Sequence, residues 1–422
     1  MESLSPKQRW IILGAAIAGL LFDGVELGLM PIASLSVTED LMGDQYTAAA
    51  GGDWFARFTA ALMLGAAIGG IAIGNLGDIL GRSRALAVSI LFYSVFAGLG
   101  AFVQTQEQML LLRFLVGLGV GGVWPNAVSL ASECWPDKSR PLVAGLMGAA
   151  LNSGVLLLSQ IALCWHITAE SWRWIFFLAA FPTLLGLAVL LVVPESPRWR
   201  SVKREGASKQ VSKKSGSLRE LFRPPLLRVT LIGITLGAIP LVGAWAASKW
   251  MIPWADKVGG ASYPGYKGMA QGSWAIGAVL GSFCGAQIAA YLGRRTAYAT
   301  ISIAATLATL LLFLGTQPLQ PSFLPLVFVQ GFVVTLYFGW LPLYLPELFP
   351  TRVRAAGSGI AYNVGRFATA VGVFLAGMLF AWLGGSYPAV GASCGLIYAV
   401  GIVAIFWAPD TSKLSLDREE PV

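Results

Sequence analysis

Apolar runs of roughly 20 residues recur along this chain of 422 residues, and they restrict its fold more than any other feature. A helix of about 20 residues crosses the roughly 30 Å of hydrocarbon in a bilayer, whereas a barrel strand needs only about 9–11 residues of alternating polarity. The runs lie at about 10–34, 54–76, 85–106, 109–131, 141–163, 173–193, 229–254, 268–290, 297–316, 323–345, 356–382 and 388–408. The sequence therefore predicts an all-α integral membrane protein with twelve transmembrane helices.

The distribution of charge predicts how this protein lies in the bilayer. Charged residues make up only 12 % of the chain, against about 25 % in an ordinary soluble domain. Most of the 29 Lys and Arg residues fall near the termini and in the loops that follow the even-numbered runs. This asymmetry places both termini in the cytoplasm, and it explains the net charge of +8 without a nucleic-acid partner. Lys7 and Arg9 precede the first run as in a signal peptide, but the run is long and lacks a convincing cleavage site, so we expect an uncleaved helix.

Two short charged sequence motifs each occur twice, and the two copies of each lie about half the chain length apart. The segments ECWPDKSR (133–140) and ELFPTRVR (347–354) share the pattern E-x-x-P-x-x-x-R. The segments GNLGDILGRSRA (74–85) and AQIAAYLGRRTA (286–297) share a Gly-Arg pair at a similar offset. A polar, basic stretch separates the copies. We therefore expect an N-terminal six-helix bundle (1–193), a cytoplasmic linker (194–228) and a C-terminal six-helix bundle (229–422), a duplication typical of alternating-access transporters.

These motifs carry a resemblance to a known family. The segment GNLGDILGRSRA resembles the loop signature G-x-x-x-D-x-x-G-R-[RK] of the major facilitator superfamily, and PESPRW (194–199) resembles its sugar-porter and organic-ion branches. The segments DGVE (23–26), WPNAVSLASE (124–133) and AYNVGR (361–366) are similar to the aromatic acid:proton and metabolite:proton symporters. Two positions depart from the pattern: Ala290 replaces the Asp of the second loop copy, and Glu26 stands where aromatic-acid symporters carry Asp. The resemblance implies two pseudo-symmetric bundles that expose a central site alternately to each side.

Two acids inside the first helix are candidates for proton coupling. Asp23 lies near the expected midplane, and Glu26 follows one helical turn later on the same face. An ionisable residue in a membrane span is costly, and two neighbouring carboxylates in a low dielectric do not both ionise easily. The alternative is a permanently charged acid that pairs with a buried Arg. The resemblance to sugar porters implies that Arg113 faces this acid, so we expect a pair of Arg113 with Glu26 or Asp23.

Basic and aromatic residues in the membrane spans are candidates for substrate binding. Arg366 lies near the middle of its helix with Asn363 one turn before it, and neither surface is within easy reach of its side chain. Bases outnumber acids among the intramembrane residues, which favours an anionic substrate. Arg57 and Lys249 lie nearer the outer surface, where snorkelling is the alternative explanation, and helix packing is the alternative for the aromatic residues. The candidate substrate-binding residues are Arg366, Asn363, Arg57, Lys249, Tyr337 and Trp340.

The repeated loop motifs supply a candidate gate at the cytoplasmic face. Carboxylate–guanidinium pairs there can hold the halves together in one conformation and break in the other. The alternative is that these bases only anchor the topology, in exposed pairs worth less than about 1 kcal/mol each. The candidate gate residues are Asp78, Arg82, Glu133, Arg140, Glu195, Arg198, Glu347 and Arg354.

Several function classes are disfavoured by what the sequence lacks. The one histidine, His166, lies in an outer loop, and the four cysteines show no disulfide or metal spacing, so we expect no enzyme, metal or cofactor. The segment GLGVGG (117–122) sits inside a membrane run and indicates close helix packing rather than nucleotide binding. We predict a monomeric, proton-coupled symporter of a small organic anion in the bacterial inner membrane. A sugar or polyol porter is the alternative.

Overall fold

Within the described part of the chain, twelve helical segments are long and apolar enough to cross a membrane, which confirms the predicted number. The computed structural model describes residues 4–134, 140–197, 199–200, 218–350 and 353–411, and all regular structure within these ranges is helical. The contacts between residues divide the chain into two compact units, Met1–Ser212 and Lys213–Val422. The division falls inside the expected linker at 194–228, of which residues 198 and 201–217 lie outside the described part.

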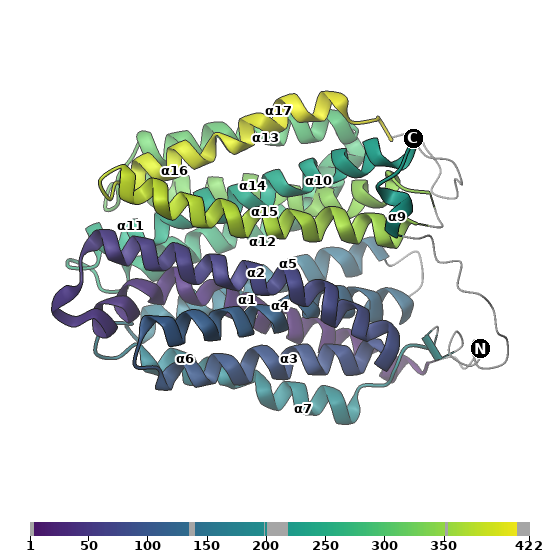
Figure 1. Cartoon of the computed structure of the whole chain (residues 1–422), viewed down its shortest axis with the longest axis horizontal. Helices are drawn as coiled ribbons and strands as arrows, with labels where there is room; N and C mark the ends of the chain where they lie inside the picture. Colours follow the sequence, from purple (N-terminus) through teal and green to yellow (C-terminus); the bar gives the residue numbers. More distant parts are fainter. Residues whose placement is uncertain (1–3, 135–139, 198, 201–217, 351–352, 412–422) are drawn as a thin grey trace. The chain divides into compact units, whose positions relative to one another are not determined.

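The first unit contains the first six membrane-spanning segments (Figure 1). The sixth segment consists of two helices, because Pro182 begins the second and cannot continue the N–H ladder of the first. The helices of this unit are α1 (Pro6–Met42), α2 (Ala48–Leu80), α3 (Arg82–Leu99), α4 (Gln106–Cys134), α5 (Arg140–Cys164), α6 (Arg173–Ala180) and α7 (Pro182–Val192).

The first helix is longer than its apolar run predicts and continues past residue 34 to Met42. Its last turns carry polar side chains that contact the segment before α6. The Ser36 hydroxyl donates to the Ile167 carbonyl (3.1 Å), and the Asp40 carboxylate accepts a hydrogen bond from the Trp172 indole (3.0 Å). The predicted end at residue 34 was therefore too early. It was placed where the sequence becomes polar, but the polar side chains of these turns form hydrogen bonds within the unit, so the helix continues.

The second unit contains the remaining six segments, and its first segment changes helix type midway. A π-helix (Gly243–Ala247) and a 3-10 turn (Ser248–Trp250) follow α10 and precede α11. The expected linker also contains helical residues, since α9 lies within it and α10 begins at Leu226. The helices are α9 (Leu218–Leu221), α10 (Leu226–Val242), α11 (Met251–Gly259), α12 (Tyr266–Leu292), α13 (Arg294–Leu314), α14 (Phe323–Glu347), α15 (Arg354–Trp382), α16 (Tyr387–Gly395) and α17 (Ile397–Ala404), with a final 3-10 turn at Ile405–Trp407.

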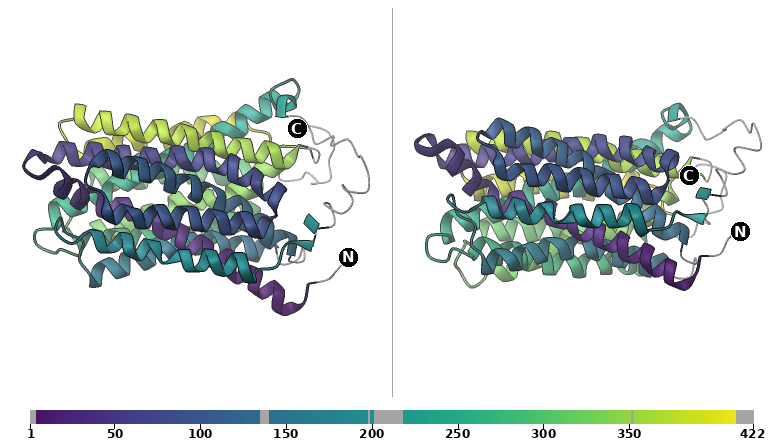
Figure 2. Two further views of the ribbon diagram at one scale, coloured as in Figure 1. Left: turned by 60° about the horizontal axis from the view of Figure 1, so that its bottom comes forward. Right: turned by 90° about the horizontal axis from the view of Figure 1, so that it is seen from below.

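Both units use the same pattern of helix packing. In the first unit α1 packs on α5, α2 on α4 and α3 on α7, and in the second α10 packs on α15, α12 on α14 and α13 on α17. The long helices within each unit run side by side in both views of Figure 2. Equivalent segments therefore pair in the same way in each unit, as a duplicated six-helix sequence predicts.

Small residues bring the paired helices close together. A Cβ atom added at Gly65 of α2 would lie 2.1 Å from the Phe114 carbonyl oxygen of α4, and one at Gly117 would lie 2.3 Å from the Leu62 oxygen. In the second unit, Gly277 of α12 approaches the backbone of α14 in the same way. The GLGVGG segment thus serves helix packing, as expected from its place inside a membrane run.

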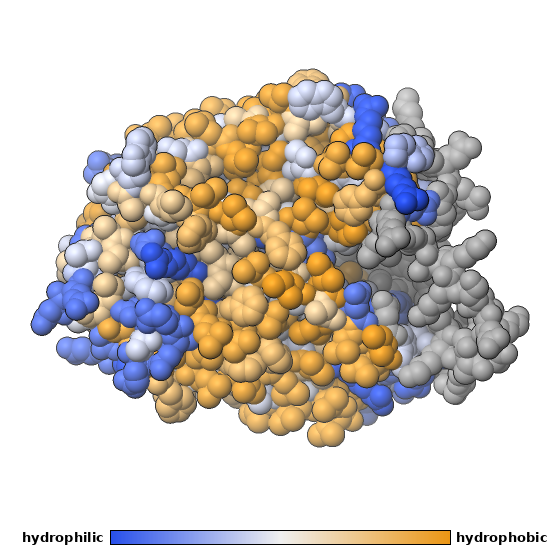
Figure 3. Space-filling view, in the orientation of Figure 1, coloured by the Kyte–Doolittle hydropathy of each residue, from blue (hydrophilic) through white to orange (hydrophobic). Residues whose placement is uncertain are grey.

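The surface of the helices matches a hydrocarbon environment. Apolar side chains cover much of the face drawn in Figure 3, and hydrophilic side chains gather toward the ends of the helices. Exposed apolar residues include Leu184, Leu191 and Phe406. A soluble protein rarely exposes so much contiguous apolar surface, whereas lipid chains cover such a surface without cost.

Candidate functional site

A buried ion pair between α1 and α4 forms the centre of the candidate coupling site. The Arg113 Nη1 atom lies 3.2 Å from the Glu26 Oε2 atom, and both side chains are 1 % exposed. A second guanidinium nitrogen of Arg113 donates to the Glu26 backbone carbonyl at 3.4 Å. Of the two pairs that we predicted for Arg113, the one with Glu26 is confirmed.

The close contact between α1 and α5 determines which way the acids of α1 point. A Cβ atom at Gly24 would lie 1.8 Å from the Leu151 carbonyl oxygen, so this side of α1 rests directly on α5. Successive residues turn by about 100° around a helix, which directs Asp23 and Glu26 away from α5. Both acids are fully buried. Close packing on one side of α1 therefore presents the two carboxylates together on another.

Some polar atoms of this cluster have unused hydrogen-bonding capacity. Within the described part of the chain, the Glu26 Oε1 atom, the Arg113 Nε atom and the Tyr93 hydroxyl have no hydrogen-bond partner. Tyr93 lies on α3, is fully buried and interacts electrostatically with both Asp23 and Glu26. We did not single out Tyr93 from the sequence, although a tyrosine in the middle of an apolar run was a usable signal. The free Glu26 oxygen and the Tyr93 hydroxyl leave hydrogen-bonding capacity in the cluster.

Arg57 has a partner of its own near the start of α2. Its guanidinium lies 2.7 Å from the Asp53 carboxylate and 4.9 Å from the centre of the Trp54 ring, and its side chain is 44 % exposed. This arrangement fits the alternative of an interfacial basic residue. Its role in substrate binding stays a prediction.

Lys249 is buried rather than directed to the surface. It lies in the 3-10 turn after the π-helix, where its residue is 2 % exposed. Its Nζ atom is 3.4 Å from the centre of the Trp274 ring on α12 and 5.6 Å from that of Trp245. The snorkelling alternative for Lys249 is therefore wrong, because the change of helix type turns this side chain into the unit.

The aromatic candidates of α14 pack within the second unit. Tyr337 and Trp340 are fully buried, and both rings contact that of Tyr298, with centroids 5.0 and 4.6 Å away. The Tyr337 hydroxyl donates to Ser302 (2.7 Å), and the Trp340 indole donates to the Arg294 carbonyl (2.8 Å). These contacts fit the packing alternative, and stacking on a substrate ring stays a prediction.

Arg366 and Asn363 lie on α15 and are partly buried. The Arg366 guanidinium carbon is 5.2 Å from the centre of the Tyr362 ring. A guanidinium can stack on an aromatic face and can also form bidentate hydrogen bonds with a carboxylate through its planar edge. The geometry is compatible with anion binding, and this role also stays a prediction.

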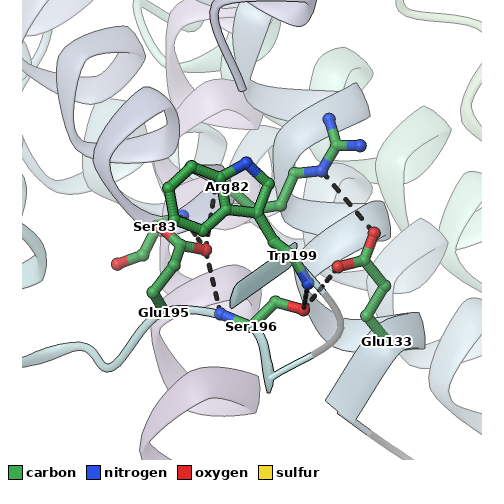
Figure 4. A network of polar contacts seen from close by, with 6 residues as sticks. All are labelled: Arg82, Ser83, Glu133, Glu195, Ser196 and Trp199. Atoms are coloured by element: carbon green, nitrogen blue, oxygen red, sulfur yellow. Dashed lines mark hydrogen bonds and ion pairs between the residues drawn. The ribbon is translucent and has the colours of Figure 1, made fainter. Parts of the chain in front are cut away.

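Three candidate gate residues of the first unit, Arg82, Glu133 and Glu195, belong to a connected polar network (Figure 4). The Glu195 carboxylate accepts hydrogen bonds from the backbone N–H groups of Arg82 (2.9 Å) and Ser83 (3.1 Å), at the start of α3. The Arg82 Nε atom lies 3.6 Å from Glu133 at the end of α4, and the Ser196 hydroxyl donates to the same carboxylate at 2.5 Å. A carboxylate at a helix N-terminus is stabilised by the exposed N–H groups and the helix dipole. The network thus joins the α2–α3 turn, α4 and the segment after α7.

An equivalent network closes the corresponding end of the second unit. Arg294 contacts the Glu347 carboxylate twice, from Nε (3.1 Å) and from Nη2 (2.8 Å). The Thr411 hydroxyl, in the segment after the last helix, donates to the same carboxylate. Glu133 and Glu347 therefore each pair with the arginine of a Gly-Arg turn. We did not select Arg294 from the sequence, although its place in the second Gly-Arg copy marked it.

The other four gate residues are not described at the level of side chains. Arg198 lies outside the described residues altogether, and only the backbones of Asp78, Arg140 and Arg354 are described. The positions of these side chains in the gate stay predictions.

Cysteine and metal chemistry find little support in this region. Burial, together with the neighbouring carboxylates of Glu133 and Glu195, raises the pKa of the Cys134 thiol to about 12, so the reactive thiolate is scarce at neutral pH. Within the described part of the chain, no three His, Cys, Asp or Glu side chains come together as a metal site requires.

Comparison with known proteins places this arrangement in a family. Residues 12–421 match the family described as sugar (and other) transporter. The cis,cis-muconate transport protein of Acinetobacter baylyi is 29 % identical over 405 residues, which cover 94 % of this chain and 95 % of that protein. The probable 4-methylmuconolactone transporter of Cupriavidus pinatubonensis is 28 % identical over 363 residues, which cover 83 % and 81 %.

A solved structure shares the fold. The crystal structure of a D-xylose-proton symporter superposes with a TM-score of 0.74 at 19 % sequence identity, covering 95 % of this chain and 98 % of that one. At this identity the likeness concerns the fold alone. Since the family match extends over nearly the whole sequence, the chain belongs to the sugar (and other) transporter family of the major facilitator superfamily, as its loop motifs predicted.

Proposed function

We propose that this protein is a secondary active transporter of the bacterial inner membrane that carries a small organic anion together with protons. The observation that carries the proposal is the distribution of buried charge. The first unit holds an acid–base cluster of Asp23, Glu26 and Arg113, and the second holds the buried cation of Lys249. The two relatives named for muconate and methylmuconolactone transport support an organic acid as the substrate.

The acid cluster of α1 is suited to carry the proton. Arg113 cannot lose its proton in a protein, so the pair changes charge only at the carboxylates. A proton on Glu26 weakens its attraction to Arg113 and leaves a guanidinium that must find another partner, for which Asp23 is placed one turn away. Proton uptake would in this way alter the contact between α1 and α4, which is a contact that a conformational change can use.

Arg366 and Lys249 are the cations best placed to hold the substrate anion, with Asn363 as a neutral neighbour of Arg366. Arg57 lies in a partly exposed ion pair with Asp53, and Tyr337 and Trp340 donate hydrogen bonds within the second unit, so these three residues have a smaller role in this proposal.

Uptake into proteoliposomes tests the proposal. Labelled cis,cis-muconate and benzoate should accumulate when the outside is more acidic than the inside, and unlabelled carboxylates should compete while D-xylose should not. Equal accumulation with and without the pH gradient would contradict proton coupling. Uptake that D-xylose blocks and carboxylates do not would replace the proposal with the sugar-porter alternative.

The loop networks are proposed as the gate. Glu133→Gln removes the charge that Arg82 contacts and leaves the candidate binding residues unchanged. It should change the efficiency of crosslinking between cysteines introduced on the cytoplasmic ends of the two halves. Asp40→Asn is a matched control, since Asp40 forms an ion pair with Arg173 at 2.7 Å at the opposite end of the first unit. Equal crosslinking in the parent and in Glu133→Gln would leave these charges as topological anchors.

A further inference from the structure

A cluster of polar side chains lies inside the second unit, where residues of the turn before α11, of α12 and of α14 contact one another. We define the Lys249 cluster as Lys249, Gln271, Trp274 and Gln330, all of which are buried. Lys249 comes from the turn before α11, Gln271 and Trp274 from α12, and Gln330 from α14. Of these four residues, only Lys249 was predicted from the sequence to bind substrate.

The charge of Lys249 has no acidic counterpart within the described part of the chain. No carboxylate there lies within 4.0 Å of its Nζ atom, and the nearest aromatic contact is the Trp274 ring at 3.4 Å. A cation–π contact recovers only part of the hydration that a buried ammonium loses. By contrast Lys267, on the same helix as Trp274, pairs with Asp256 at 3.0 Å. An anion supplied by a ligand would complete the site at Lys249.

The amide of Gln271 is also unsatisfied. Both its Oε1 and its Nε2 atoms are buried without a hydrogen-bond partner among the described residues. A buried polar group without a partner is destabilising, so natural proteins retain few of them outside functional sites. Gln271 precedes Trp274 by three residues, so both side chains lie on one side of α12, and Trp274 is the residue of this side that contacts the Lys249 ammonium.

The Gln330 amide, by contrast, is hydrogen-bonded within the protein and holds the Trp274 ring in place. Its Oε1 atom accepts the Trp274 indole N–H at 2.9 Å, and its Nε2 atom donates to the hydroxyls of Ser248 and Thr309. These hydrogen bonds use the amide fully and fix the Trp274 ring against Lys249. Of the two buried glutamines in the cluster, one is committed to the protein and the other is available to a ligand.

We propose that Lys249 and Gln271 form a two-point subsite for an organic acid that carries a second oxygen substituent. The ammonium binds the carboxylate, and the Gln271 amide hydrogen-bonds the second oxygen, as donor to a carbonyl or carboxylate and as acceptor from a hydroxyl. The proposal rests on the proposed transport of organic anions and adds a specificity-determining residue, Gln271, and a narrower class of substrate.

Binding to the purified full-length protein tests this subsite. The probes are benzoate, its 2-, 3- and 4-hydroxy derivatives, and phenol, measured by calorimetry. At least one hydroxybenzoate should bind more tightly than benzoate, and phenol should bind weakly. Gln271→Leu should abolish the advantage of the hydroxyl group, a loss of about 3- to 10-fold for one neutral hydrogen bond. Lys249→Met should weaken all the carboxylates by more than about 10-fold.

Controls separate a binding role from a structural one. Lys257→Gln removes an exposed lysine from the same segment and should leave every affinity unchanged. Gln271→Leu removes a buried amide that has no hydrogen-bond partner among the described residues, and Lys249→Met removes a buried ammonium that has no acidic partner there. Both variants should therefore be at least as heat-stable as the parent without ligand. Lower affinity together with equal or higher stability is the signature of a binding residue.

The outcomes distinguish this subsite from the general proposal. If the parent binds benzoates but Lys249→Met binds them equally well, or Gln271→Leu keeps the hydroxyl preference, the subsite is wrong and organic-anion transport stands. If the parent binds none of the carboxylates, both are overturned. The expected result is that Gln271→Leu loses the preference for hydroxybenzoates over benzoate and that Lys249→Met loses affinity for all the carboxylates.

Discussion

For the buried ion pair of Arg113 and Glu26, we predict that removal of the acid destabilises the protein more than removal of the base. Both side chains are 1 % exposed, with 3.2 Å between the Nη1 and Oε2 atoms. Removal of one partner from a buried pair commonly costs about 3–5 kcal/mol, because the other charge is left without compensation. The two removals differ here, since a carboxyl group can take up a proton to become neutral and a guanidinium cannot.

We therefore expect Glu26→Gln to lower the free energy of unfolding by about 3–5 kcal/mol, and Arg113→Gln to lower it by less. The double variant should be more stable than Glu26→Gln alone, because it contains no orphaned guanidinium. Denaturant unfolding of the purified variants measures the stabilities, and proteoliposome uptake measures the coupling. Glu26→Gln should lose accumulation driven by a pH gradient and keep exchange of bound substrate.

Asp23→Asn is the control for this prediction, because Asp23 lies one turn away and is equally buried. If Asp23 carries the transported proton instead, this variant and not Glu26→Gln loses accumulation. Unchanged accumulation in both variants would refute proton coupling at α1. Equal losses of stability in Glu26→Gln and Arg113→Gln would refute the argument from unequal neutralisation.

Three further predictions follow from other parts of the molecule. Arg366→Ala should abolish carboxylate binding and Arg366→Lys should weaken it, because an ammonium cannot replace the bidentate fork; intact affinity with lower heat stability would make Arg366 structural. Gly81→Ala should destabilise the protein more than Gly43→Ala. Both glycines have positive φ (112° and 52°), but only at Gly81 would the added Cβ atom meet a neighbour, a Glu195 carboxylate oxygen 2.1 Å away. Equal losses of stability in the two variants would show that Glu195 moves freely. At pH 7.5 maleimide should modify the exposed Cys164 and spare Cys134, whose pKa is about 12; rapid labelling of Cys134 would contradict its burial.

The features that could be predicted from the sequence are those written in long or repeated patterns. Twelve apolar runs predict twelve helices, because each must satisfy its backbone hydrogen bonds across the bilayer. The resemblance to sugar porters predicted that Arg113 pairs with Glu26 or Asp23, and the structure shows the pair with Glu26. Copies of the Gly-Arg and Glu motifs at similar offsets predicted matching ends for the two halves.

The features that could not be predicted depend on which way a side chain turns. Lys249 appeared close to the outer surface, but the π-helix before it alters the helical register and buries the lysine against Trp274. Gln271 and Gln330 look alike in sequence, and only the contacts across α12 and α14 show that Gln330 is saturated while Gln271 is not. The contact of Glu347 with Arg294, which belongs to the other motif, was not predicted.

The two units handle buried charge in different ways, and this difference favours a division of tasks between them. In the first unit a base already has its acid, so the state of that pair can change only by gain or loss of a proton at Glu26 or Asp23. In the second unit no carboxylate of the described residues pairs with Lys249, and in the proposed cycle the substrate anion would balance its charge. One proton and one monovalent anion together add no net charge to the protein. Because uncompensated charge is costly inside a membrane, the loaded form would cross between its two conformations more readily than a form that holds the anion or the proton alone.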